Sequence, residues 1–282
     1  MSIQFNKVTH IYKSVSITTD AIYNIDLNIN ETNEFICICG HTGSGKSTLV
    51  QHMNALLFPT SGTIDIFGNT IPSKKKSFKY NFLRQKVGLV FQFPEYQLFE
   101  QTILKDVMFG PKNFKVTSFN ALERAKEALN QVGIKEELFE RSPFRISGGQ
   151  TRRVAVAGIL AMDPSILVLD EPTRGLDPVG QEEIMDLFSK IHETTKKTIV
   201  LITHDMDVVS KYAKRVIVLK KGQIVFDGSK NELFVHPNFH DFSLELPTTI
   251  KIINYLKSKL NIEVDLSYNT EELCANLKKV LR

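Results

Sequence analysis

Short apolar runs alternate along the chain with longer segments in which apolar residues recur at helical spacing. The runs cover residues 35–39, 87–91, 166–169 and 199–202. Each has the length of a strand and no polar side, which predicts strands buried on both faces. The segments with helical spacing cover residues 48–57, 120–132, 148–162 and 180–194. This alternation predicts an α/β fold built on a parallel sheet.

Two further pieces of the chain carry a different strand pattern. Residues 62–68 and 215–228 contain alternating or β-branched residues around glycine turns such as Lys220-Lys221-Gly222, which indicates antiparallel hairpins. We expect both hairpins to belong to a smaller β-layer. Between about residues 95 and 162 helical patterns outnumber strands, which predicts a helical insert in the α/β core.

The last part of the chain, residues 237–282, predicts a short helical appendage to a domain that covers residues 1–236. Its apolar residues fall on two helix faces. They are Ile250, Ile253, Leu256 and Leu260, then Leu273, Leu277 and Val280. Asn269 and Glu272 have the spacing of a capping box for the last helix. The two apolar faces need burial, either on the chain's own core or against a second subunit.

The composition bounds the class of protein. Hydrophobic residues make up 42% and charged residues 23% of 282 residues, which is typical of soluble globular domains. No stretch reaches the roughly 18 to 20 apolar residues of a membrane span, and residues 1–10 lack the apolar core of a secretion signal. The net charge of +4 is too small to indicate nucleic acid as a partner. A membrane role is therefore expected to be peripheral.

The cysteines and one basic run do not indicate a separate site. Cys37 and Cys39 share one face of a predicted strand, so we expect small core residues rather than metal ligands. With Cys274 they make an odd, scattered set of three, which fits a reducing cytosol without disulfides. The run Lys74–Lys76 with Lys79 predicts a solvated loop rather than a binding patch.

A phosphate-binding loop, the Walker A pattern, follows the first buried strand and opens a helix. It reads Gly40-His41-Thr42-Gly43-Ser44-Gly45-Lys46-Ser47-Thr48. Its glycines let backbone N–H groups face phosphates, and the helix N-terminus adds a favourable potential. Lys46 is expected to reach the terminal phosphates of ATP, and Ser47 to bind Mg²⁺.

Two adjacent carboxylates end another buried strand, in the sequence 166–172. Asp170 is placed to hold the Mg²⁺ shell. Glu171, which points elsewhere, is placed to orient or deprotonate the attacking water. Together with the phosphate-binding loop, this pair predicts hydrolysis of a nucleoside triphosphate.

A second phosphate-binding helix start occurs in the sequence Ser147-Gly148-Gly149-Gln150. Ser147 and Gln150 form a predicted capping box, and the two glycines leave room for a phosphate at a positive helix end. One chain does not need two such starts for one triphosphate. The second is therefore expected to serve a nucleotide held by another chain.

These motifs, in this order, resemble the ABC ATPase family over roughly residues 1–235. The resemblance implies a P-loop NTPase fold, with a RecA-like parallel sheet core, an antiparallel β subdomain and a helical subdomain. It also implies that Tyr12 stacks on adenine, that Gln92 senses Mg²⁺ and the transporter, that His204 is the switch histidine that steadies the γ-phosphate, and that Asp177 lies in the loop between subunits.

Within that family the chain resembles the second ATPase paralogue of energy-coupling factor transporters. The resemblance is carried by residues 142–158, 40–45 and 91–99, and by the C-terminal appendage. Two residues depart from the pattern. Ile146 stands where leucine is commonest, and Arg174 stands where a small residue is usual and adds charge beside the inter-subunit loop.

The resemblance implies a complex at the cytoplasmic face of the plasma membrane. It would contain this chain, a non-identical ATPase partner, a transmembrane scaffold subunit and a membrane component that captures a vitamin or a transition-metal ion. The alternative is the ATPase of another ABC importer acting as a homodimer, against which the appendage argues. A soluble ABC ATPase of DNA repair or translation would carry a long coiled-coil insertion or two cassettes, and the sequence has neither.

Overall fold

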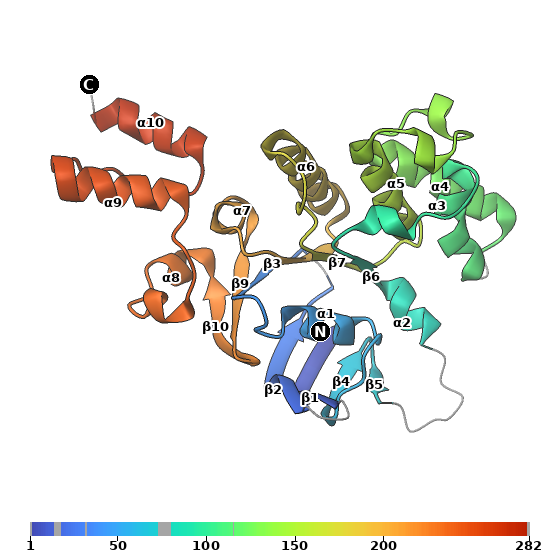
Figure 1. Cartoon of the computed structure of the whole chain (residues 1–282), viewed down its shortest axis with the longest axis horizontal. Coiled ribbons are helices and arrows are strands. Elements are labelled where there is room, and N and C mark those ends of the chain that lie inside the picture. The colour runs from blue at the N-terminus through green and yellow to red at the C-terminus, as the bar shows by residue number, and fades with distance from the viewer. Residues whose placement is uncertain (1, 14–17, 32, 73–79, 115, 281–282) are drawn as a thin grey trace.

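A central sheet forms the middle of the molecule (Figure 1). The computed structural model describes residues 2–13, 18–31, 33–72, 80–114 and 116–280. Within these residues the central sheet consists of β3 (Phe35–Cys39), β6 (Val87–Val90), β7 (Ile166–Asp170), β8 (Thr198–Ile202), β9 (Arg215–Lys220) and β10 (Gln223–Ser229). The strand order is β10-β9-β3-β8-β7-β6, and every pair is parallel except β9 with β10. The predicted parallel sheet is confirmed.

Alternate residues of the central strands enter two hydrophobic cores, one on each face of the sheet. On β3, Phe35, Cys37 and Cys39 enter one core, whereas Ile36 and Ile38 enter the other. Both cysteines are fully buried, which confirms them as small core residues. Burial raises the pKa of the Cys39 thiol to about 12, so this side chain packs as an uncharged group.

The smaller sheet is antiparallel and lies below the central sheet in Figure 1. It consists of β1 (Ile3–Lys13), β2 (Thr18–Ile29), β4 (Ser61–Ile66) and β5 (Asn69–Ile71), in the order β2-β1-β4-β5. The hairpin predicted over residues 62–68 is confirmed as β4 and β5, which pair through a turn at Phe67 and Gly68. Together with α1 and the central sheet, this sheet encloses the second core.

The second predicted hairpin was assigned to the wrong sheet. Its strands β9 and β10 do pair in antiparallel fashion, but β9 also pairs in parallel with β3 and so extends the central sheet. The reason is burial, because residues 216–219 are at most 1% exposed, as an inner strand requires. Only β10 keeps a solvated side.

Helices cover both faces of the central sheet and gather at its two ends (Figure 1). In the described residues they are α1 (Lys46–Met53), α2 (Asn81–Lys86), α3 (Ile103–Asn113), α4 (Ser118–Gln131), α5 (Gly148–Leu160), α6 (Pro178–Thr195), α7 (Met206–Tyr212), α8 (Lys230–Phe234), α9 (Thr248–Leu260) and α10 (Thr270–Val280). The four predicted helices correspond to α1, α4, α5 and α6. Of these, α1 ends before the predicted residue 57, since Ala55 adopts the left-handed conformation (φ 56°).

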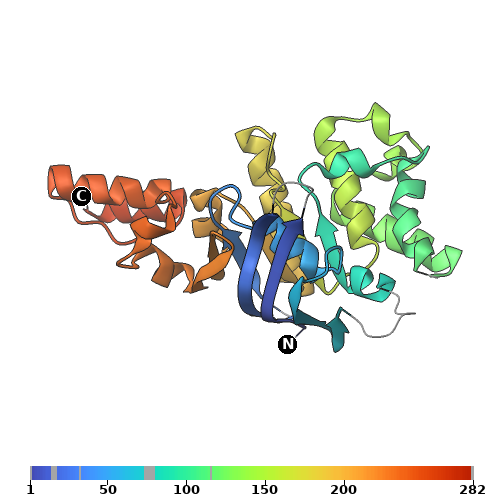
Figure 2. The same ribbon diagram turned by 60° about the horizontal axis from the view of Figure 1, so that its bottom comes forward.

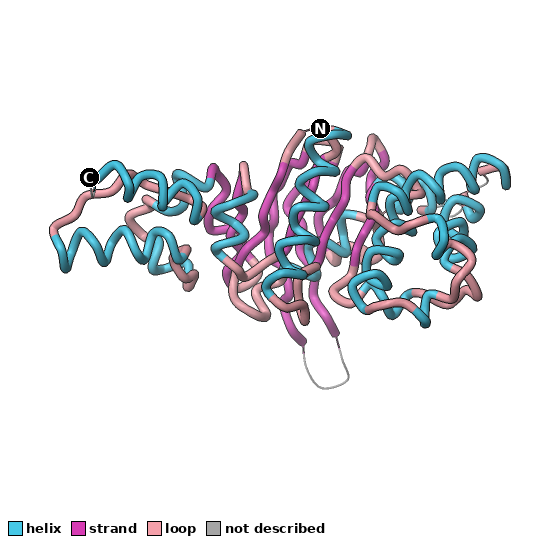
Figure 3. The backbone as a smooth tube through the Cα atoms, turned by 90° about the horizontal axis from the view of Figure 1, so that it is seen from above, coloured by secondary structure: helices cyan, strands magenta, loops and turns pink. Residues whose placement is uncertain are grey.

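The helices α3, α4 and α5 lie at one end of the molecule, and α9 and α10 lie at the other (Figure 2, Figure 3). The first group falls within the predicted helical insert, and the second within the predicted appendage. The predicted capping box at α10 is only half right. The Glu272 backbone N–H donates to Asn269 Oδ1 (2.8 Å), but the Glu272 carboxylate accepts from the N–H of Tyr268 rather than that of Asn269.

The apolar faces of the appendage are only partly covered by the chain's own residues. Ile250, Ile253 and Leu273 are at most 8% exposed, whereas Leu260 and Val280 are 56% and 46% exposed. The appendage therefore packs on its own domain near α7 and leaves its far end open. The basic run that we predicted as a solvated loop, Lys74–Lys76 with Lys79, lies outside the described residues. Across the described ranges, no helix is both long enough and apolar enough to cross a bilayer.

Candidate nucleotide-binding and catalytic site

The phosphate-binding loop joins β3 to α1 and requires glycine at two crowded positions. Gly40 and Gly45 adopt φ values of 144° and 103°. A Cβ atom on Gly40 would lie 2.2 Å from the Leu219 carbonyl oxygen, and one on Gly45 would lie 2.3 Å from that of Ala21. Any side chain there would clash with backbone, so the loop keeps its shape only with glycine.

Lys46 and Ser44 line the inside of this loop. The Lys46 ammonium donates to the carbonyl oxygens of Gly40 (2.7 Å) and His41 (2.9 Å), so the side chain folds back over the loop. Burial lowers the pKa of Lys46, and the carboxylate of Glu171 opposes this shift. The Ser44 hydroxyl is buried and finds no hydrogen-bond partner among the described residues. A phosphate in the loop would supply acceptors for both groups.

The predicted Mg²⁺ ligands Ser47 and Asp170 lie together. Burial raises the pKa of the Asp170 carboxyl above its ordinary value, and a hydrogen bond from the Ser47 side chain partly offsets that shift. A carboxylate and a hydroxyl at one point are oxygen ligands of the kind that Mg²⁺ prefers. The two residues therefore fit the ion, although they come from α1 and from the end of β7.

Glu171 accepts hydrogen bonds from three side chains. Its Oε1 accepts from Nδ1 of His204 (3.2 Å), and its Oε2 accepts from Nε2 of Gln92 (3.1 Å) and from Nη1 of Arg174 (3.3 Å). The residue adopts a left-handed backbone conformation (φ 48°), and its N–H donates to the Ile202 carbonyl. Non-glycine residues adopt this conformation uncommonly, and here it follows the end of β7.

An open pocket joins the phosphate-binding loop to these carboxylate partners. It is lined by Gly40, His41, Thr42, Glu171, Arg174 and His204, with Thr203 and Asp205 behind them. The structure therefore brings the loop, the predicted catalytic carboxylate and the predicted switch histidine to one place. A base, an oriented histidine and a phosphate cradle around one pocket are suited to phosphoryl transfer to water.

Tyr12 lies beside the helix that follows the loop. Its side chain is 44% exposed, and its hydroxyl is 3.3 Å from the Thr48 hydroxyl. The ring of His10 packs edge-on against Tyr12, with centroids 4.6 Å apart, and the buried His52 packs behind His10. The exposed ring of Tyr12 is therefore supported by His10 on one side.

The second helix start and Asp177 lie outside this pocket. The capping box of α5 is confirmed, since the Gln150 N–H donates to Ser147 Oγ and the Ser147 N–H donates to Gln150 Oε1. Gly148 and Gly149 are exposed and have no atom within 4 Å of an added Cβ. Asp177 is exposed and caps α6 through Gly180 (2.7 Å).

Sequence reasoning missed a buried arginine that connects three of these segments. Arg152 on α5 forms a bidentate ion pair with Glu95 (2.9 and 3.1 Å), which lies three residues after Gln92 in the sequence. It also donates to the carbonyl oxygens of Pro172 and Arg174, in the turn after Glu171. The one available signal was a charged residue on the apolar side of a predicted helix.

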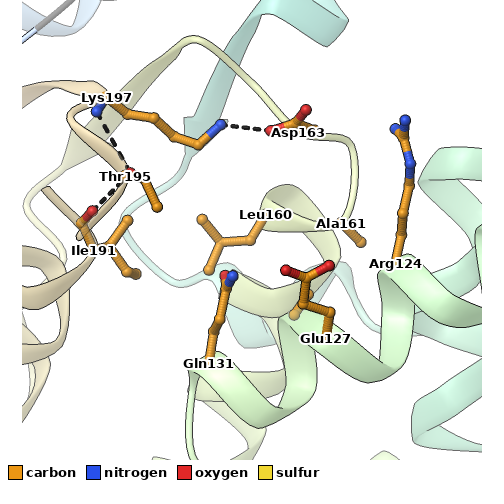
Figure 4. A pocket seen from close by; sticks show the side chains of 10 residues that line it. Arg124, Glu127, Gln131, Leu160, Ala161, Asp163, Ile191, Thr195 and Lys197 are labelled. Atoms are coloured by element: carbon orange, nitrogen blue, oxygen red, sulfur yellow. Dashed lines mark hydrogen bonds and ion pairs between the residues drawn. The ribbon is translucent and has the colours of Figure 1, made fainter.

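A separate pocket lies between α4, the end of α5 and α6 (Figure 4). Charges of both signs line it, and Lys197 bridges its edge to Asp163 (2.6 Å). None of its lining residues belongs to the phosphate-binding loop or contacts Glu171. It therefore does not form part of the catalytic site.

Known proteins match both the sequence and the fold. Residues 22–174 match the ABC transporter family. The energy-coupling factor transporter ATP-binding protein EcfA2 of Bacillus subtilis (strain 168) is 50% identical over 243 residues, covering 86% of this chain and 88% of that protein. The protein of the same name in Bacillus anthracis is 45% identical over 285 aligned residues, covering 100% of this chain and 97% of that protein.

Two solved structures share the fold. CbiO1 from Clostridium perfringens, part of the ABC transporter complex CbiONQ, has a TM-score of 0.74 at 35% identity and covers 92% of this chain and 95% of that one. A dimeric post-hydrolysis state of the ATP-binding cassette MJ0796, bound to ADP and Pi, has a TM-score of 0.70 at 33% identity, with 80% and 98% covered. The predicted fold class is confirmed. The chain therefore belongs to the ABC transporter family, as an ATP-hydrolysing subunit of the energy-coupling factor group.

Proposed function

We propose that this ATPase powers uptake of a micronutrient, a vitamin or a transition-metal ion, through an energy-coupling factor importer of the plasma membrane. The observation that supports it best is the hydrogen-bonding of Glu171 by His204 and Gln92 beside the phosphate-binding loop. The names of the relatives, and the CbiONQ complex to which one structural neighbour belongs, support the same assignment.

In this proposal ATP binds with its phosphates in the loop and its base on Tyr12. The loop residues that contact the phosphates are Gly40, His41, Thr42, Gly43, Ser44, Gly45, Lys46, Ser47 and Thr48. Lys46 releases the two carbonyl oxygens that it now contacts and turns to the terminal phosphates. The aromatic face of Tyr12 supports the adenine ring.

Mg²⁺ is held by Ser47, Asp170 and Gln92 in this proposal. All three can supply oxygen atoms, and the Ser47 side chain is near enough to Asp170 to lower the pKa of its carboxyl. The bound ion neutralises charge on the phosphates. Glu171 then orients the attacking water and accepts its proton, while His204 turns from Glu171 to steady the γ-phosphate.

The exposed start of α5 is proposed to serve the nucleotide of a second ATPase paralogue. Ser147, Gly148, Gly149 and Gln150 present a helix N-terminus to solvent, a place that favours phosphate. Asp177, exposed at the start of α6, would lie in the same contact between subunits. The domain at residues 1–236 carries this contact, and the appendage at residues 237–282 adds to it through the open end of its apolar faces.

The transmembrane scaffold is proposed to dock at a groove formed by α2, α3 and α5, most of whose lining residues belong to the helical insert at about residues 95–162. The groove is lined by apolar and polar residues, among them Phe99, Phe109 and Met162. Phe99 and Phe109, whose rings lie 4.8 Å apart, are 57% and 44% exposed and would suit a helix of a partner. Gln97, Leu98 and Phe99 of the groove follow Gln92 closely in the chain, which would link docking to Mg²⁺ sensing. The subunit would thus lie at the cytoplasmic face, with the substrate-capturing component beyond the scaffold.

Glu171→Gln tests the catalytic part of this proposal. The amide keeps the shape of the side chain but cannot accept the proton, so turnover in the purified complex should fall by about 100 to 10,000-fold. ATP binding, measured by direct titration, should persist. Near-normal hydrolysis by this variant would refute the role of Glu171.

Purification from detergent-solubilised native membranes tests the assembly. A tagged chain should recover a second, different ATPase together with hydrophobic membrane subunits. Recovery of this chain as the sole ATPase, in two copies, would favour a homodimeric ABC importer instead.

A further inference from the structure

Arg174 contacts the catalytic carboxylate from within the same turn. Its N–H donates to the Glu171 carbonyl (3.1 Å), and its Nη1 lies 3.3 Å from Glu171 Oε2. Its own carbonyl accepts from the buried Arg152, which fixes the backbone of Arg174 while 58% of its side chain stays exposed. The backbone of Arg174 is therefore fixed, whereas its exposed guanidinium has room to form or break the ion pair with Glu171.

The three donors to Glu171 differ in what else they do. On the proposed function, His204 contacts the γ-phosphate and Gln92 binds Mg²⁺. Arg174 has neither role, and it brings a cationic guanidinium to the carboxylate. Arg174 and Gln92 both donate to Oε2 of Glu171. The arginine therefore occupies a lone pair of the carboxylate that, on the proposed function, accepts a proton from water.

We propose that Arg174 is a positioning residue that restrains Glu171 in a resting orientation, so that its ion pair must open before the carboxylate takes the attacking water. This inference rests on the proposed role of Glu171. It assigns Arg174 a restraining effect on turnover, with no part in nucleotide binding. Because the Arg174 side chain is 58% exposed, its pair with the 19% exposed Glu171 is accessible to solvent from the arginine side, which makes it weak and sensitive to ionic strength.

The test compares Arg174→Gln with Arg174→Lys in the purified transporter complex. Arg174→Gln removes the charge and should raise kcat for ATP by about two- to fivefold at low salt, with an unchanged KM. Arg174→Lys keeps a cation and should stay near the wild type. Raising the salt concentration should accelerate the wild type toward the Gln variant and leave that variant unchanged, because screening weakens only a charged pair.

Lys126→Gln is the matched control. It removes another exposed ion pair with i, i+3 spacing, to Glu123 on α4, and should change neither kcat nor its salt response. A kcat for Arg174→Gln equal to or below that of the wild type would overturn the inference, as would the same salt response in both. Glu171→Gln separates the two failures. If that variant is inactive and Arg174→Gln has no effect, only the restraint is wrong; if it is active, the proposed function itself fails.

Discussion

Replacement of Arg152 by methionine should destabilise the subunit more than any exposed charge substitution. The Arg152 side chain is 6% exposed and makes four hydrogen bonds, two to the Glu95 carboxylate and two to the carbonyl oxygens of Pro172 and Arg174. Methionine matches the length of the side chain but satisfies none of these acceptors. Removing one partner of a buried ion pair costs about 3 to 5 kcal/mol. Since the Glu95 side chain remains 21% exposed, we expect the lower end, about 3 kcal/mol.

Urea unfolding of the purified subunit measures this loss from the free energy of unfolding. Arg153→Met is the control, because Arg153 is the next residue on the same helix and pairs with Glu183, which is 60% exposed. That substitution should cost less than about 1 kcal/mol. A double-mutant cycle with Glu95→Gln isolates the coupling between the two partners. A loss for Arg152→Met no larger than that for Arg153→Met would refute the argument from burial.

Three further outcomes are expected. Lys46→Ala should weaken ATP binding in a direct titration, because the cation of the phosphate cradle is lost; unchanged affinity would contradict its assigned role. Tyr12→Ala should weaken ATP binding by about 1 to 3 kcal/mol and Tyr12→Phe should not, since the ring is retained; equal losses would point to the hydroxyl. Deletion of residues 248–282 should leave a folded chain that binds ATP but no longer retains its ATPase partner without nucleotide. Equal recovery of the partner by both forms would show that the appendage serves only its own domain.

Four of the described strands of the central sheet could be predicted from the sequence, whereas the two longest described strands could not. β3, β6, β7 and β8 are buried on both faces, so they appear as apolar runs. β1 and β2 pair through several register shifts, which break the alternation that marks a half-buried strand. Lys7 and Asn24 even adopt positive φ angles within these strands. The sequences of β1 and β2 therefore show neither the continuous apolar run of a fully buried strand nor the regular alternation of a half-buried one.

The site divides in the same way. The phosphate-binding loop, the capping box of α5 and the Asp170-Glu171 pair are local patterns, in which neighbouring residues alone indicate the chemistry. Arg152 pairs with Glu95, which lies 57 positions away in the sequence, and no local pattern indicates such a partner. The contact between Arg174 and Glu171 is local but follows from the left-handed turn at Glu171, which the sequence does not reveal.

The order of the strands explains why the residues proposed for catalysis meet. The phosphate-binding loop follows β3, His204 follows β8, Glu171 follows β7, and Gln92 follows β6. These strands are neighbours in the order β3-β8-β7-β6, and they are parallel, so their carboxyl ends share one edge of the sheet. Residues 79 and 33 positions from Glu171 therefore contact it directly. Ser147 and Asp177 are the N-caps of α5 and α6 instead, and both are exposed to solvent. On the proposed function, sheet topology thus assembles one half of an ATP site within this chain. The exposed N-termini of α5 and α6 would contribute to the ATP site of a second chain.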